Sequence, residues 1–580
     1  MLNGKKIRLF NHDSWGNSTA TYEEAVKTAR TLKKLGYNSA RGLFPVDAKD
    51  SHFKNIIRAC DEEGLLLFVC LKGVTAKTYT LWNDPKTRAG LEKYMASVIR
   101  KWRNHPSNVM YFLSTNFLGY GLDYHPLKMA DGYLPSGDKR RKAEVCMSGV
   151  EIMRKYDPDR PYFFQAGGNF GEVITSNAYF CWWPQTEKNA WPQEWAKIGR
   201  KPLHIIETSF PYVNSYYGMD RFGGHKPLFA YESAARYFGD AAYEMPDPDL
   251  FAQTELSTRG LDSRAYYDTE IMQKMKSQML SETIKYWRGF GMSGISPFAE
   301  LFYLYRTQSD PRNWYDAKEY KVKQDDFRAS GLHPDVIKMP YLAEFDPENP
   351  LPARDALMGA LEPFKAFIGG TEDEPADQSA NFFEGENVSR TAIVVNDTRR
   401  ETEAKVSWRA SGKGGKIAEG AETVRLAPAG IGKVPIKFAL PETGGDAEYF
   451  IELSASADGL PESRDRVKIR SFAKTPEPAA ARCALFGSDK GSAEILSACG
   501  IKFSDAASSG LGGADVLIVA RDALDDKFFD FARKNSLAAR VNSGKLSVLL
   551  LEQKPELLKR IGIMAAPVYS RKIFEKNEVD

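Results

Sequence analysis

The chain is poor in cysteine and almost neutral. Six of its 580 residues are Cys, and no two of them have the CxxC spacing of a zinc ribbon or a redox motif. Their scatter also argues against a disulfide scaffold. Lys and Arg number 79 and Asp and Glu 76, which gives a net charge of +3. Neither nucleic acid nor an anionic membrane is therefore expected as a partner.

Long apolar runs are lacking as well. No stretch of about 18 apolar residues occurs, so no transmembrane span is expected. The first ten residues, MLNGKKIRLF, lack the apolar core of a signal peptide. The compartment stays undetermined, with the cytoplasm as the default. The histidines His12, His105 and His125 are too dispersed to suggest a metal site, and no cofactor is expected.

Aromatic residues, in contrast, are plentiful. The chain has ten Trp, 27 Tyr and 33 Phe. Aromatic faces stack on sugar rings, although most of these residues are expected in the core. The length and a hydrophobic content of 43% allow roughly two to four domains.

Up to about residue 370, short apolar runs alternate with amphipathic helical stretches. This alternation is typical of a parallel sheet with crossover helices. The expected helices cover residues 22–35, 53–63, 87–103, 140–155 and 269–288. The expected strands cover residues 7–10, 38–41, 65–71, 109–113, 162–165, 178–181, 203–206 and 292–295. Eight such strands predict an α/β fold, a (β/α)₈ TIM barrel, over residues 1–370.

Two further domains are expected after an acidic linker. Period-2 strands with Gly and Pro turns predict an immunoglobulin-like β-sandwich over residues 380–473. Residues 481–580 then predict a flavodoxin-like α/β domain that is short of strands, which suggests a fragment of a longer protein. This unit resembles glutamine amidotransferase-like domains, but no His follows His333 to serve as a catalytic partner. We expect it to be non-catalytic, with a role in packing or homo-oligomerisation.

Active sites of such barrels lie at the C-terminal ends of the strands. Polar and aromatic residues follow most of the expected strands and should converge on one rim. The candidates are His12, Asp13, Arg41, Asn116, Tyr120, Asp123, Gln165, Trp182, Trp183, Glu207 and Glu300.

Five segments, in order, resemble the catalytic barrel of family 2 glycoside hydrolases, the β-galactosidase and β-glucuronidase group. They are GKKIRLFNHD, LKKLGYNSAR, CDEEGLLLFV, NHPSNVMYFL and KPLHIIETSF, and the resemblance covers about residues 4–300. The most similar members are uncharacterised bacterial relatives with Asn in place of the acid/base Glu. The resemblance implies activity on a carbohydrate substrate.

The resemblance also implies roles for individual residues. Glu207 matches the family's nucleophile; the alternative is a structural Glu paired with Arg41, which matches the family's strand-2 Arg. Asn116 stands where the family has its acid/base Glu, and an amide cannot protonate a leaving group. It could instead bind a sugar hydroxyl or cap a turn. Asp123 is the leading replacement acid, with Glu300 and Asp13 as alternates.

The remaining rim residues are less diagnostic. Trp182 and Trp183 could form a sugar platform or belong to the core, and Gln165 could contact substrate or tie strand ends together. Two functions therefore stay open. The first is a hydrolase of β-linked oligo- or polysaccharides, retaining if Glu207 is its nucleophile. The second is a carbohydrate-binding pseudoenzyme with a degenerate acid/base site.

Overall fold

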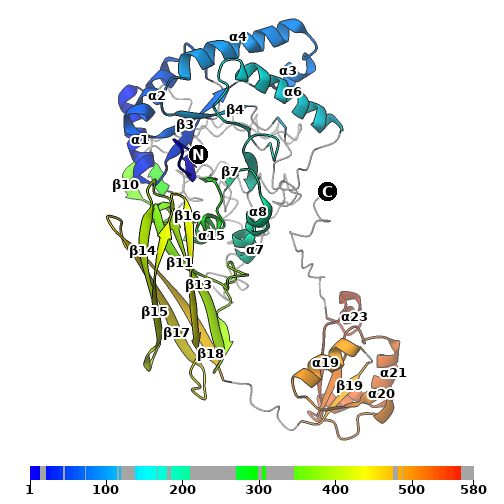
Figure 1. The fold of residues 1–580 in the computed structure, drawn as a ribbon. Helices are drawn as coiled ribbons and strands as arrows, with labels where there is room; N and C mark the ends of the chain where they lie inside the picture. The colour runs from blue at the N-terminus through cyan, green and yellow to red at the C-terminus, as the bar shows by residue number, and fades with distance from the viewer. Residues whose placement is uncertain are drawn as a thin grey trace.

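The protein is described by a computed structural model (Figure 1). The described residues are 1–12, 21–42, 46–71, 73–113, 117–118, 137–165, 167–178, 185–208, 270–297, 304–307, 345–473, 481–487 and 489–563.

The N-terminal part is an eight-stranded parallel sheet in the order β5-β4-β3-β2-β1-β8-β7-β6, as the predicted barrel requires. Its strands are β1 (Leu9–His12), β2 (Ser39–Arg41), β3 (Leu66–Leu71), β4 (Asn108–Leu113), β5 (Tyr162–Phe164), β6 (Ile174–Ala178), β7 (Leu203–Thr208) and β8 (Gly294–Pro297). The expected strand at 178–181 was misplaced, because β6 ends at Ala178. The side chain of Thr175 closes the seam between β5 and β6, donating to the carbonyl of Phe164 and accepting from the amide of Gly167.

Helices cover the outside of the barrel. They are α1 (Tyr22–Lys34), α2 (Ser51–Glu63), α3 (Ala76–Thr80), α4 (Pro85–Trp102), α6 (Gly137–Arg154), α7 (Gln185–Ala190), α8 (Gln193–Ile198), α14 (Glu270–Gln278), the π-helical turn η1 (Met279–Thr283), α15 (Ile284–Gly289) and α18 (Pro352–Leu361). Local sequence sets their starts: Thr21 and Glu24 form a capping box before α1, and Asp50 and Asp84 cap α2 and α4. None of the described helices has the length and apolar character needed to cross a bilayer.

Two antiparallel sheets follow. One has the order β11-β13-β16 and the other β12-β18-β17-β14-β15, where only β12 and β18 run parallel. Their strands are β11 (Phe364–Gly369), β12 (Asn381–Phe383), β13 (Asn387–Asn396), β14 (Thr402–Gly412), β15 (Gly415–Leu426), β16 (Gly430–Ala439), β17 (Ala447–Ala457) and β18 (Ser463–Phe472). Since β11 pairs with β13 along its whole length, we place the start of the sandwich at Phe364 instead of at 380.

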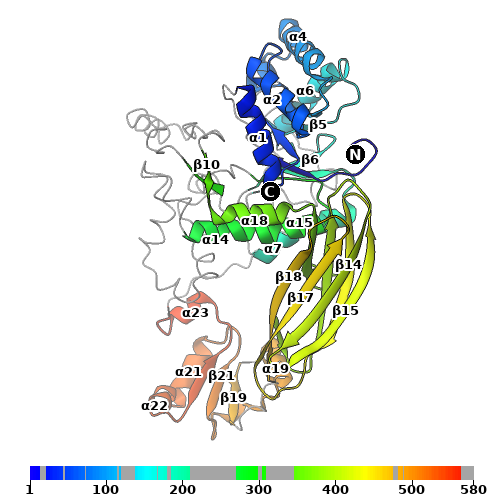
Figure 2. The same cartoon turned by 90° about the vertical axis from the view of Figure 1, so that its left-hand side faces the viewer.

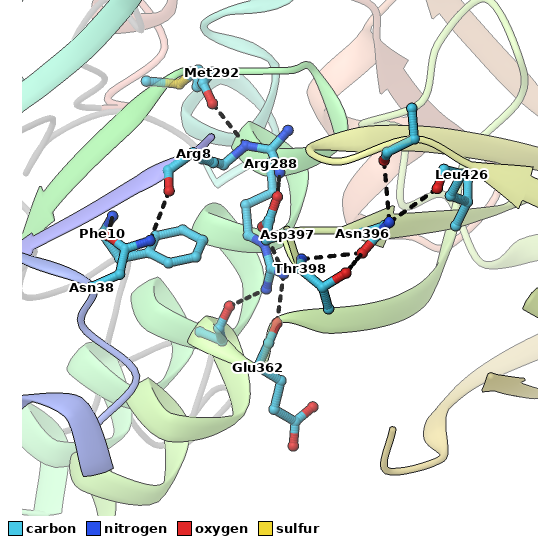
Figure 3. A network of polar contacts seen from close by, with 12 residues as sticks. Arg8, Phe10, Asn38, Arg288, Met292, Glu362, Asn396, Asp397, Thr398 and Leu426 are labelled. Atoms are coloured by element: carbon cyan, nitrogen blue, oxygen red, sulfur yellow. Dashed lines mark hydrogen bonds and ion pairs between the residues drawn. The ribbon is translucent and has the colours of Figure 1, made fainter. Parts of the chain in front are cut away.

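Barrel and sandwich share a buried charge cluster. Asp397, in the turn after β13, pairs with Arg8 before β1 and with Arg288 on α15 (Figure 3). Arg8 also donates to the carbonyl of Met292 at 2.8 Å, and Arg288 donates to the carbonyl of Glu362 at 2.6 Å. Figure 2 shows α14 and α18 side by side near α15, next to the ends of the sandwich strands. The sandwich is thus tied to the segments that lead into β1 and β8.

A small α/β unit ends the described chain, and β9 (Tyr305–Thr307) and β10 (Phe345–Pro350) form a separate pair before α18. The unit has four parallel strands in the order β20-β19-β21-β22. Its elements are β19 (Cys483–Phe486), α19 (Lys490–Ala498), β20 (Phe503–Asp505), α20 (Ala506–Ser509), β21 (Val516–Val519), α21 (Asp526–Lys534), α22 (Leu537–Asn542), β22 (Ser547–Leu550) and α23 (Pro555–Lys559). Its assignment as flavodoxin-like stays a prediction.

Candidate active site

A β-bulge turns Glu207 into the barrel interior. Along β7, Ile205 pairs with Ser176 of β6 and Glu207 pairs with Asn177, which leaves Ile206 without a partner. The pairing of β7 with β8 is irregular over the same residues. Ile206 already packs inside the barrel, so strict alternation would turn Glu207 outward toward the helices. The extra residue turns Glu207 inward as well, as bulges next to active sites commonly do.

Three strands supply hydrogen-bond donors to the Glu207 carboxylate. Arg41, at the end of β2, places Nη2 3.4 Å from Oε1, and Gln165, just after β5, donates Nε2 to the same oxygen. Asn177, on β6, donates Nδ2 to Oε2 at 2.8 Å. Arg41 is itself held, since its Nη1 donates to Oε1 of Gln165 at 2.7 Å and its Nη2 to the carbonyl of Ile206 at 3.2 Å.

These hydrogen bonds hold the Glu207 carboxylate in a fixed position that is almost inaccessible to solvent. The side chain of Glu207 is 7% exposed and that of Arg41 is fully buried. An ionised carboxylate accepts hydrogen bonds only, and all three neighbours donate to it. The predicted contact between Glu207 and Arg41 is present, and Gln165 joins the same cluster. A structural Glu would have the same Arg partner, so the pair alone does not separate the two interpretations of Glu207.

A second polar group lies between β7, β8 and β1. The hydroxyl of Ser296 lies 2.9 Å from Nε2 of His204 and accepts a hydrogen bond from Nδ2 of Asn11 at 3.0 Å. Burial, and secondarily the charge of Arg41, lowers the pKa of His204 to about 3, so its ring is neutral. The fully buried ring fits because residue 294 is Gly: a Cβ there would lie 2.5 Å from Cγ of His204.

The sequence prediction missed Asn11, Asn177, His204 and Ser296. Asn177 is part of the run ITSNA, whose polar residues hide the strand in the sequence. In the structure all five residues of this run are buried. His12, which was predicted, lies buried at the end of β1 with its ring 5.5 Å from that of Tyr37. Its contact with substrate stays a prediction.

Seven predicted residues lie outside the described residues. They are Asp13, Asn116, Tyr120, Asp123, Trp182, Trp183 and Glu300. Their roles stay predictions. Within the part of the chain that the structure describes, no group of three or more His, Cys, Asp or Glu could hold a metal ion.

Comparison with known proteins gives similar folds only. No family model and no curated protein matches the sequence. A β-D-mannosidase from Dictyoglomus thermophilum is 13% identical, with a TM-score of 0.45 over 80% of this chain and 50% of the enzyme. An exo-chitosanase from Amycolatopsis orientalis is 12% identical, with a TM-score of 0.40 over 81% and 50%. A β-glucuronidase from Parabacteroides merdae is 12% identical, with a TM-score of 0.33 over 82% and 50%.

These neighbours are β-glycosidases, the enzyme class that the sequence resemblance implied. The chain spans about half the length of each. At these identities and TM-scores, no residue of this chain takes its role from them.

Proposed function

We propose that the barrel is the catalytic domain of a glycoside hydrolase that acts on β-linked sugars, with Glu207 as the nucleophile. One observation carries the proposal. Glu207 is a nearly buried carboxylate at the C-terminal end of a barrel strand, turned inward by a bulge and held by donors from three other strands. A retaining glycosidase needs a carboxylate held in this way below the anomeric carbon.

The proposed reaction has two steps. An oxygen of Glu207 attacks the anomeric carbon, the bond to the leaving group breaks, and a glycosyl ester forms; water then hydrolyses the ester. Arg41 and Gln165 orient the carboxylate during both steps. A poor leaving group also needs a proton, which Asn116 cannot supply, and we propose Asp123 as the donor.

A second function has its own support. Asn116 replaces the acid/base Glu of the resembling family, and losing a general acid typically costs roughly 10²–10⁴-fold in rate. A barrel without any substitute acid would bind a sugar without cleaving natural linkages. This alternative is a carbohydrate-binding pseudoenzyme.

Removal of the nucleophile tests the first function. Glu207→Ala should abolish hydrolysis of activated aryl β-glycosides, and azide should restore turnover by attacking the anomeric carbon from the vacated side, giving a glycosyl azide. Glu194→Ala is the matched control, because Glu194 is an exposed carboxylate on α8 paired with Lys197. An unchanged rate in Glu207→Ala would refute the nucleophile role.

The proton donor is tested separately. Asp123→Asn should leave kcat/KM for aryl glycosides with good leaving groups almost unaffected and lower kcat/KM for oligosaccharides by roughly 10²-fold or more. Equal effects on both substrate types would exclude Asp123 as the acid. If the unmodified protein yields no product from any substrate while sugars raise its thermal midpoint, the pseudoenzyme is the correct function.

A further inference from the structure

Only one of the two polar atoms of the Asn177 side chain forms a hydrogen bond in the described part of the chain. Its Nδ2 donates to Oε2 of Glu207 at 2.8 Å, which fixes the orientation of the amide because the carboxylate is an acceptor. Its Oδ1 has no hydrogen-bond partner anywhere in the part of the chain that the structure describes. The residue is 2% exposed. Buried acceptors are rarely left unpaired, and each exception calls for an explanation, such as a role in a functional site or a bound water.

Gln165 offers a direct contrast. It contacts the same carboxylate through Nε2, but its Oε1 accepts a hydrogen bond from Nη1 of Arg41 at 2.7 Å. Both ends of the Gln165 amide are therefore occupied within the protein. Of these two amides around Glu207, only the one at position 177 has an acceptor left for a ligand.

We propose that Oδ1 of Asn177 accepts a hydrogen bond from a sugar hydroxyl, and that Asn177 thereby determines specificity. An amide oxygen accepts from a hydrogen-bond donor such as a sugar hydroxyl and cannot bind an ionised carboxylate or phosphate oxygen. This inference rests on the proposed function, in which Glu207 lies below the anomeric carbon. The other end of the Asn177 amide binds Glu207, so the hydroxyl in question is the one on the carbon next to the reacting carbon.

The test compares a sugar with its deoxy analogue. The probes are 4-nitrophenyl β-D-mannoside, β-D-glucoside and β-D-galactoside; the one that is best turned over or bound is paired with its 2-deoxy analogue. The quantity is the ratio of kcat/KM for the pair, or of dissociation constants where no product forms. Since each variant is compared with itself, a lower folded fraction cancels from the ratio.

The unmodified protein should prefer the hydroxylated sugar by about 10- to 100-fold, because the analogue leaves Oδ1 unpaired. In Asn177→Ala the preference should fall to within about 2-fold. Asn177→Leu, which keeps the branched shape without polar atoms, should do the same if the Ala variant does not fold. Gln165→Ala should lower activity or affinity for both sugars and keep the preference.

Two results would overturn the inference. A preference in Asn177→Ala and Asn177→Leu equal to that of the unmodified protein would show that Oδ1 does not contact the sugar hydroxyl. Loss of the preference in Gln165→Ala as well would assign the effect to the carboxylate cluster as a whole. The proposed function fails differently: no probe would be bound or cleaved by the unmodified protein at all.

Discussion

Asn177 lies opposite Glu207 across the β6–β7 pair because one residue of β7, Ile206, is left out of the register. The bulge lets two consecutive side chains face the barrel interior, where Ile206 packs in the core and Glu207 meets its donors. The position of the carboxylate thus depends on backbone geometry as much as on the identity of residue 207.

Removing the guanidinium of Arg41 next to Glu207 should lower the stability of the barrel. Arg41→Met removes a fully buried guanidinium from its place beside a nearly buried carboxylate, and we expect the free energy of unfolding of the barrel to fall by about 3–5 kcal/mol. Adding Glu207→Gln should recover part of that loss, because the buried negative charge that Arg41 faced is then gone. Urea denaturation followed by tryptophan fluorescence measures both variants. Simply additive losses would show that the two side chains are not coupled.

The buried cluster at the barrel–sandwich junction should behave in the same way. Asp397 is 1% exposed and faces Arg8 and Arg288, which are 3% and 0% exposed at their side chains. Asp397→Asn removes the carboxylate that two buried guanidinium groups share, so we expect a loss of about 3–5 kcal/mol in the free energy of unfolding.

An exposed ion pair on the sandwich is the control for Asp397. The side chains of Arg466 and Glu452 are 58% and 53% exposed, and Glu452→Gln should cost less than about 1 kcal/mol. We also expect barrel and sandwich to unfold in one transition, measured by calorimetry, since Asp397 joins them. Equal losses in Asp397→Asn and Glu452→Gln would contradict a structural role for the junction.

The sequence predicted the elements better than the site. The three- and four-residue spacing of apolar residues placed α1 and α2 within two residues of their observed bounds, because this signal is local. β6 was misplaced because its residues Ile174–Ala178 are buried on both faces but mostly polar, which hides the strand from an apolar pattern. The inward turn of Glu207 and its contact with Asn177 depend on the bulge, which leaves no mark in the run LHIIET.

The buried ring of His204 should make stability depend on pH. Its pKa is lowered from 6.5 to about 3, so the folded protein resists a proton that the unfolded chain accepts. The free energy of unfolding should therefore fall as the pH drops from about 6.5 toward 3, by up to about 1.4 kcal/mol per pH unit from this residue. His204→Gln removes this contribution while keeping a partner for Ser296.

Unfolding of His204→Gln and of the unmodified protein should be compared at pH 7.5 and pH 5. The other histidines and the carboxylates contribute equally to both proteins, so the difference isolates His204. We expect the unmodified protein to lose more stability between the two pH values than the variant. Parallel losses would show that His204 gains its proton in the folded state.

The ring of His204 should also require a glycine at position 294. A Cβ at this position would lie 2.5 Å from Cγ and 2.8 Å from Nδ1 of His204, and a rigid ring buried in the barrel cannot move away cheaply. Gly294→Ala should therefore cost about 1–3 kcal/mol through overpacking. In a His204→Ala background the added methyl has room, and the same substitution should cost much less. A double-mutant cycle by urea denaturation measures this coupling. Additive effects would mean that β8 shifts to accommodate the methyl group. The His204 ring would then not be the reason that position 294 needs a glycine.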